Sequence, residues 1–243
     1  MATLYGANVV RDGLVLHLDA ANVKSYPGSG ATWHDLSGNG NHTTISQGSF
    51  NTNGYFESVG DAPSRLFFIT PTSNSLSDTL SVTSGGWTIE EDVLIDDTTY
   101  PESTAGTTFG TTVYIAGSIG IDWAHGTATN SNINLTINDG TNLVRQNLSL
   151  NATQSQYDKW IHRTFVYDRT NGDLIVYYDG IYQNTLDISS VTGSVYNGVN
   201  LQWGELYGWR HDGFRAGMKI YNRVLSSEEI QQNFNAARGR FGI

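Results

Sequence analysis

Apolar and polar residues alternate along most of this chain, with the period of two that a half-buried β-strand produces. Leu14, Leu16 and Leu18 begin the pattern, and turn-forming residues separate each alternating segment from the next. The same alternation predicts strands over 65–70, 87–95, 113–122, 132–138, 143–150, 159–168, 173–179, 181–186 and 213–221. Most of the chain is therefore predicted to fold as β-structure.

Tight turns connect several of these strands. Asp139-Gly140 joins two of them as a hairpin, for which Asp-Gly is a strong signal. Asn171-Gly172 and Asp179-Gly180 divide the segment from 159 to 186 into a three-stranded meander. The total is roughly a dozen strands, enough for two packed sheets of about six strands each. The predicted fold class is all-β, a two-sheet antiparallel jelly-roll sandwich with one short C-terminal helix.

That helix is the only segment with helical spacing of apolar residues. Ser226 and Glu229 form a capping box, which satisfies two backbone donors at the helix start. Leu225 is placed to pack on Ile230 as a hydrophobic staple, and the amphipathic pattern ends near Gly239. The strand before the helix is predicted to be half-buried, with one face formed by Phe214, Ala216, Met218 and Ile220.

The 243 residues are predicted to form one domain over 13–243, preceded by an arm or edge strand over 1–12. The chain has no cysteine, which excludes disulfides and thiolate metal sites. No apolar run approaches the ~20 residues needed to span a bilayer. The first residues lack the basic segment and apolar run of a signal peptide. We therefore expect a soluble protein that is synthesised in a cytoplasm and does not insert into a membrane.

The charge balance and the motifs exclude several functional classes. Thirteen basic against 23 acidic residues give a formal net charge of −10, which opposes binding to nucleic acid. The histidines do not fall into a zinc spacing. The sequence contains no phosphate-binding glycine loop, dinucleotide fingerprint or serine nucleophile elbow. We therefore expect no enzyme activity and no cofactor, with a calcium ion as the one alternative considered below.

Segments at both ends of the chain resemble one known family. The final strand and helix carry YNR-x-LS-x-x-E-I from Tyr221 to Ile230, and the start carries GLVLHLDA from Gly13 and WHDLSGNGN from Trp33. These segments resemble LamG-type, concanavalin A-like lectin/glucanase domains over roughly 13–243. KSYPGSG at 24–30 and RGRFGI at 238–243 are similar to the variety found in virion proteins of tailed bacteriophages. The resemblance implies a jelly roll and a binding or structural role.

Glucanases of this family place three acids at i, i+2 and i+4 on one strand, which suits retaining hydrolysis. Glu90 and Asp92 occupy the first two positions here, on the face opposite Trp87, and Glu91 interrupts the apolar face. Leu94 stands where the third acid is needed. The set is incomplete, so we expect no hydrolysis by this route.

Oxygen-bearing side chains gather in the early loop. Asp35 and Asn39 lie in a DLSGNGN segment whose ligand types suit a hard cation, and Asp19 is nearby in sequence. The resemblance implies a calcium ion near such a loop, sometimes with an acid from the last strand, where this chain has Lys219. One interpretation is calcium held by Asp19, Asp35 and Asn39. The alternative is an Asx-type turn without metal.

Aromatic and polar residues near predicted strand ends have the composition of a sugar site. Aromatic rings stack on the C–H faces of sugars, and Asn, Asp and His bind the hydroxyls. The candidate carbohydrate-binding residues are Trp123, His125, Trp203, Tyr207, Trp209, His211 and Asp212. In the alternatives, the tryptophans pack in the core or seat a neighbouring protein subunit.

Two functional hypotheses remain. In the first, the chain is a structural protein of a tailed-phage virion, such as a capsid decoration or small appendage protein, that contacts other capsid or tail proteins in multiple copies or as a homo-oligomer. The arm over 1–12 and the tail over 238–243 are then the expected contact segments. In the second, it is an adhesin module that binds host-surface glycans. The first hypothesis places it in the virion after synthesis in the host cytoplasm.

Overall fold

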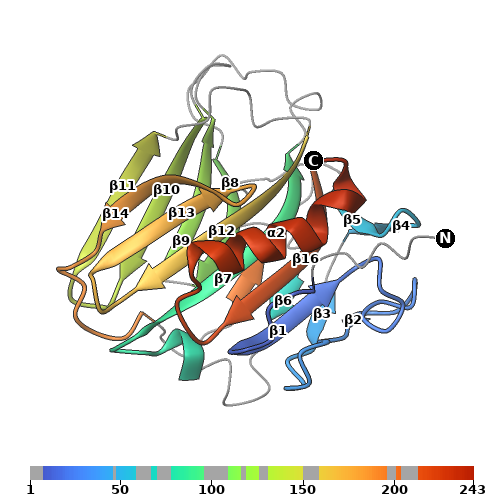
Figure 1. Cartoon of the computed structure of the whole chain (residues 1–243), viewed down its shortest axis with the longest axis horizontal. Helices are drawn as coiled ribbons and strands as arrows, with labels where there is room; N and C mark the ends of the chain where they lie inside the picture. Colours follow the sequence, from blue (N-terminus) through green and yellow to red (C-terminus); the bar gives the residue numbers. More distant parts are fainter. Residues whose placement is uncertain are drawn as a thin grey trace.

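The computed structural model describes residues 8–45, 48–58, 67–69, 78–95, 109–115, 119–125, 131–149, 159–195, 201–203 and 213–243. Two antiparallel sheets of eight strands each face one another, and a single long helix lies across the outside of one of them (Figure 1). The predicted jelly-roll sandwich with a C-terminal helix is confirmed. The sheets are larger than the expected six strands because short strands that the alternation pattern missed extend them.

The sheet beneath the helix, here called the helix-side sheet, has β7 and β16 at its centre. β1 and β5 both pair with β16, at different points along it. In spatial order its strands are β14 (Ile181–Asp187), β13 (Asp173–Tyr178), β12 (Trp160–Asp168), β7 (Gly86–Ile95), β16 (Gly213–Tyr221), β5 (Tyr55–Ser58) and β4 (Ser49–Asn51), with β1 (Leu14–Asp19) beside β16.

The second sheet closes the other side of the sandwich. Its order is β11 (Leu143–Ser149), β10 (Ser131–Asn138), β9 (Ile119–His125), β8 (Phe109–Ile115), β15 (Leu201–Trp203), β6 (Phe67–Ile69), β3 (Thr43–Ile45) and β2 (Thr32–Trp33). The β10–β11 hairpin around Asp139-Gly140 forms as predicted, with Asn138 opposite Leu143. One prediction was wrong: the segment 113–122, expected as one strand, spans parts of β8 and β9, which pair with each other.

The main core fills the space between the sheets. Trp33, Trp87 and Phe165 are fully buried there, and Trp87 stacks on Tyr167 with ring centroids 4.9 Å apart. Ile133, Leu135 and Ile137 of β10 contribute from the opposite sheet, at the alternate positions that the period-two pattern requires. This burial is the main source of the sandwich's stability.

β16 departs from its predicted alternation because it contains a β-bulge. Its pairing with β7 shifts register between Arg215 and Gly217. An extra residue in one strand moves every later side chain to the opposite face. Phe214 therefore lies on the outer face, whereas Met218 is in the core between the sheets, although both were expected on one face. The strand is also buried on both faces rather than half-buried, since α2 covers its outer side.

α2 (Ser227–Phe241) starts with the predicted capping box. The Ser226 hydroxyl accepts from the Glu229 amide at 3.3 Å, and the Glu229 carboxylate accepts from the Ser226 amide at 3.0 Å. The helix continues past the expected end at Gly239 and is capped by Gly242 at a φ of 69°. A left-handed cap of this kind is most often glycine. Because the cap is at Gly242, the helix includes most of the 238–243 segment that was expected to be a tail.

Residues 78–80 are also helical, in a segment for which no helix or strand was predicted. No helix in the described ranges is long and apolar enough to cross a membrane.

Substitution of Ser226 by alanine is expected to lower the free energy of unfolding by about 1 kcal/mol, because the Glu229 amide loses its acceptor. Ser227→Ala is the matched control, since Ser227 is exposed and lies one residue inside the helix. Urea denaturation at equal m-values measures the difference. Equal midpoints for the two variants would contradict the assigned cap.

Candidate functional site

The acidic residues of β7 point to both sides of the helix-side sheet. Glu91 faces the interior, where its carboxylate lies 2.9 Å from an Arg163 nitrogen and accepts a hydrogen bond from the Trp203 indole at 2.8 Å. Glu90 and Asp92 face outward, beneath α2. The sequence prediction that Glu90 and Asp92 share the face opposite Trp87 is therefore confirmed.

Glu90, Asp92, His162 and Lys219 form what we call the buried charge cluster. His162 Nδ1 lies 2.8 Å from Asp92 Oδ1, and its Nε2 lies 3.8 Å from Glu90 Oε1. Lys219 Nζ lies 3.6 Å from Glu90 Oε2 and 4.0 Å from Asp92 Oδ2. These four residues come from three adjacent strands, β12, β7 and β16. Two carboxylates face two cations, so the cluster is close to neutral overall.

The electrostatics keep all four groups charged. Burial alone would lower the pKa of His162, but the Asp92 and Glu90 carboxylates outweigh it and raise that pKa to about 9. Burial likewise opposes ionisation of Glu90 and Asp92, yet the Lys219 ammonium and His162 hold both pKa values below the ordinary range. The same carboxylates raise the pKa of Lys219 against its desolvation.

Asn233 of α2 closes the cluster from above. Its side-chain amide donates to both oxygens of Glu90 at 3.0 Å and to the Tyr221 hydroxyl at 2.9 Å. Its carbonyl oxygen accepts from the Val10 amide at 2.8 Å. The Tyr221 hydroxyl in turn donates to the Val10 carbonyl at 3.1 Å. The buried polar groups of the helix, the sheet and the N-terminal segment thus satisfy one another's hydrogen bonds.

Residues 8–12 of the N-terminal segment are therefore held on their own domain. Gln232 donates to the Asn8 carbonyl at 2.6 Å, and Arg223 pairs with the Asp12 carboxylate at 2.9 Å. This part of the predicted arm is engaged by α2 and the β16–α2 connection, which limits what it offers to another protein.

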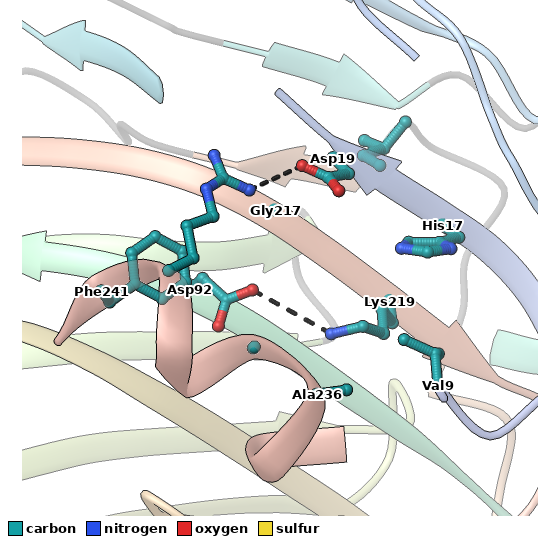
Figure 2. A pocket seen from close by; sticks show the side chains of 11 residues that line it. Val9, His17, Asp19, Asp92, Gly217, Lys219, Ala236 and Phe241 are labelled. Carbon is teal, nitrogen blue, oxygen red and sulfur yellow. Dashed lines mark hydrogen bonds and ion pairs between the residues drawn. The ribbon is translucent and has the colours of Figure 1, made fainter. Parts of the chain in front are cut away.

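A small pocket lies beside the cluster, between β1, β16 and the C-terminal half of α2 (Figure 2). Lys219 and Asp92 point toward one another in it, and Arg240 pairs with Asp19 at 2.6 Å. Burial is the main cause that lowers the pKa of His17 to about 4, and the nearby Lys219 ammonium is the second cause. This ring is therefore neutral at neutral pH. The volume of about 120 Å³ holds roughly four water molecules at ~30 Å³ each. It is below the ~300 Å³ of typical ligand sites.

This arrangement does not suit glycoside hydrolysis. A glycosidase needs an accessible nucleophile and an acid whose pKa is raised. Glu90 is fully buried, Asp92 is 6% exposed, and both have lowered pKa values. Leu94, which replaces the third acid, lies on the same strand opposite Trp160 and Phe214. Glu90 instead accepts hydrogen bonds from Asn233 of α2, and Asp92 pairs with His162 and Lys219.

The predicted calcium ligands do not fit a cation. The Asp35 carboxylate accepts hydrogen bonds from the backbone amides of His17, Ser37 and Asn41, at 2.8 to 3.0 Å, and from the Ser37 hydroxyl. Asn39 turns its amide nitrogen, not its oxygen, to the Leu14 carbonyl. Asp19 is paired with Arg240. The described residues contain no group of three or more His, Cys, Asp or Glu able to hold a metal ion.

The predicted sugar-binding residues have different outcomes. Trp203 does not fit the site, because it is fully buried in the core and stacks near Trp33, so it offers no ring face to a ligand. Trp123 and His125 lie in β9, opposite Ile133 and Ser131 of β10. Tyr207, Trp209, His211 and Asp212 lie outside the described residues.

The roles of His162, Lys219 and Asn233 were not predicted from sequence. The available signal was a pair of ionisable residues, His162-Arg163, in the interior of a predicted strand. Charged residues at such positions are rarely buried without partners. Their partners lie about 70 residues away in sequence, as for His162 and Asp92. No local pattern connects them.

Three comparisons place the chain among known proteins. A laminin G-type family model, described as the concanavalin A-like lectin/glucanases superfamily, matches residues 97–231, more than half of the chain. No curated protein sequence matches it.

Solved structures show the same fold at low identity. The botulinum neurotoxin serotype D binding domain has a TM-score of 0.67 at 15% identity, covering 95% of this chain and 53% of its own. The binding domain of Paraclostridial Mosquitocidal Protein 1 has a TM-score of 0.60 at 17% identity, covering 93% and 52%. A botulinum neurotoxin DC binding domain in complex with SialylT scores 0.64 at 15% identity, covering 93% and 52%. This chain spans about half the length of these structures. Fold and family model agree, and the chain belongs to the concanavalin A-like lectin/glucanases superfamily.

Proposed function

We propose that this chain is a non-enzymatic binding module that recognises glycans. The observation that carries the proposal is the burial of Glu90 and Asp92 beneath α2, where His162 and Lys219 neutralise them. In a superfamily of lectins and glucanases, burial of these two strand acids favours binding over hydrolysis as the function of the domain.

The structural relatives support the same class of function. Those described above are binding domains, and one is a complex with SialylT. Another structure concerns cell entry of botulinum neurotoxin type C, which depends on interaction with two ganglioside molecules. These properties belong to longer and distant proteins, so glycan recognition by this chain is a proposal.

One end of the sandwich is the expected location of the site. β9 ends at His125, opposite the start of β10, and β15 ends at Trp203, beyond which residues 204–212 lead to β16. In the pairing with β8, both β9 and β15 run toward the start of β8, so their ends point the same way. The ends of β9 and β15 therefore lie toward one end of the domain, and this end is where we propose the site.

A multivalent form of the protein is expected to bind a glycan array, and Trp209→Ala is expected to reduce the signal at least tenfold through loss of ring stacking, worth about 1.4 kcal/mol. Tyr182→Ala is the matched control, because Tyr182 is 48% exposed on the edge strand β14. Absence of binding to every glycan would overturn the proposal. Equal loss of glycan binding in both variants would show that Trp209 is not a specific part of the site.

A second candidate is a multi-copy virion protein, which the KSYPGSG and RGRFGI segments favour. Because residues 8–12 and Arg240 are engaged within the domain, the contact test should remove only residues 1–7. The shortened protein is expected to fold, with an unchanged melting temperature, but to lose co-sedimentation with virions. Full co-sedimentation of the truncated form would show that this segment is not the anchor, and failure of the intact chain to co-sediment would end the virion hypothesis.

A further inference from the structure

A larger pocket lies at the end of the sandwich where β7 starts, away from the start of β16 at Gly213. It has a volume of about 420 Å³. Three segments line it: 82–86 at the start of β7, the β12–β13 turn at 168–171, and the β16–α2 connection at 222–224. Gly86 and Asp168 pair at this end of the sheet, whereas Leu94 and Trp160 pair toward the other. The pocket shares no lining residue with the buried charge cluster and lies at the other end of β7 from the start of β16.

The walls of this pocket are fixed by internal hydrogen bonds. Asp168 accepts from the backbone amides of Thr170 and Asn171, at 3.0 and 3.1 Å, and from the Asn171 side chain at 2.7 Å. The Arg169 amide donates to the Gly85 carbonyl at 2.8 Å, which joins two of the three lining segments. A preformed pocket binds without the entropic cost of ordering its walls.

The two charged residues that line the pocket, Asp168 and Arg223, already have partners. Arg223 forms ion pairs with Glu229 at 2.6 Å and with Asp12 at 2.9 Å. Both oxygens of Asp168 accept hydrogen bonds within its own turn. Asp168 keeps its negative charge, and the one lining cation, Arg223, is ion-paired, so an anionic ligand finds no unpaired cation in the lining.

Neutral polar groups remain available. Among the described residues, the hydroxyls of Ser84 and Thr170 and the side-chain amide of Asn222 make no hydrogen bond, although they line the pocket. Hydroxyls donate and accept, and amides do both through separate atoms. Val82 and Val224 supply an apolar surface beside them. A ligand that matches this set carries several hydroxyls, an apolar C–H face and no negative charge.

We propose that this pocket, formed by 82–86, 168–171 and 222–224, binds a neutral saccharide unit. Its volume lies within the ~300–1,000 Å³ of small-molecule sites, which is enough for a sugar ring. The inference rests on the proposed glycan-binding function but assigns it a second site, at the other end of the domain. Two sites at opposite ends would allow one domain to engage two glycans.

The chain provides a matched pair of turns for the test. The turn at Asp139–Asn142 repeats the hydrogen bonds of the Asp168–Asn171 turn: Asp139 accepts from the Thr141 amide, the Asn142 amide and the Asn142 side chain. Thr141 and Thr170 are both exposed, but only Thr170 lines the pocket. Thr170→Trp fills the pocket, and Thr141→Trp adds the same bulk elsewhere.

The experiment is a titration of the ¹⁵N-labelled protein with glucose, galactose, mannose and N-acetylglucosamine, followed by amide chemical shifts. For at least one sugar we expect saturable shifts at Thr170, Asn171 and Val224 in the wild type and in Thr141→Trp. Thr170→Trp is expected to weaken that binding at least tenfold. Glucuronate should bind no more tightly than glucose, because Arg223, the one cation among the described lining residues, is ion-paired.

Absence of saturable shifts at these amides for all four sugars would overturn the inference, as would unchanged binding in Thr170→Trp. Shifts near the ends of β9 and β15 without shifts at the pocket would overturn this site and leave the proposed function intact. If Thr170→Trp removes the sugar-induced amide shifts at the pocket while binding to the glycan array persists, both sites are supported.

Discussion

Replacement of Lys219 by methionine is expected to lower the free energy of unfolding by about 3–5 kcal/mol, which is a large share of a typical domain's stability. Lys219 is 5% exposed and faces the carboxylates of Glu90 and Asp92. Methionine keeps most of the side-chain volume but leaves two buried carboxylates opposed by His162 alone. The cost comes from the uncompensated charge, not from lost packing.

Arg240→Met is the matched control for this prediction. The Arg240–Asp19 pair has the shorter distance, 2.6 Å, but its side chains are 27% and 32% exposed. Exposed pairs contribute about 0–1 kcal/mol, so the control should cost far less despite its better geometry. Adding Glu90→Gln to Lys219→Met should recover part of the loss by restoring neutrality. Equal unfolding free energies for Lys219→Met and Arg240→Met would show that the buried charge cluster does not stabilise the fold.

Local sequence patterns predicted the elements that local forces determine. The capping box at Ser226 and Glu229 depends on residues three apart, and the hairpin at Asp139-Gly140 depends on a two-residue turn. Both were found from sequence. The division of β7 into an apolar face and an acidic face follows from strand geometry, and the structure has it as expected.

Features that depend on distant pairing were not predictable in this way. The bulge between Arg215 and Gly217 exists only in relation to β7, more than a hundred residues earlier, so no alternation within β16 signals it. Trp203 is fully buried, and its indole donates to Glu91, which lies 112 residues earlier in the sequence, across the sandwich interior. An aromatic residue near a strand end has the same sequence signature whether it packs inward or faces a ligand.

The buried charge cluster is also expected to make stability depend on pH on the alkaline side. His162 has a folded-state pKa of about 9 against an ordinary value of 6.5. A raised histidine pKa adds stability that is complete below the unfolded value and is lost as pH rises through the folded value. At 1.36 kcal/mol per pKa unit the effect is on the order of 3 kcal/mol between pH ~6.5 and ~9.

The other charged groups of the buried charge cluster keep their charge between pH ~6.5 and ~9. Asp92 and Glu90 of β7 have lowered pKa values, so they are ionised throughout this range, and the pKa of Lys219 is raised, so it remains protonated. Asp179, which accepts a hydrogen bond from the His162 amide, has a pKa raised by burial. Phe234 of α2 packs on the ring and carries no charge. Proton loss from His162 therefore dominates the change between neutral pH and pH ~9.

Urea unfolding at intervals from pH 6 to 9.5 measures this dependence. The wild type should lose stability steadily as pH rises, whereas His162→Gln should be less stable at pH 6 and show a much flatter profile. His17 is the internal contrast: its pKa is lowered to about 4, so its contribution is complete above its unfolded value of 6.5 and is lost as pH falls below it. His17→Gln should therefore leave the alkaline profile unchanged and flatten the acidic one. An alkaline slope that survives in His162→Gln would mean that another group loses its proton there, and an NMR titration of the His162 ring with a midpoint near 6.5 would show that the carboxylates do not hold the imidazolium.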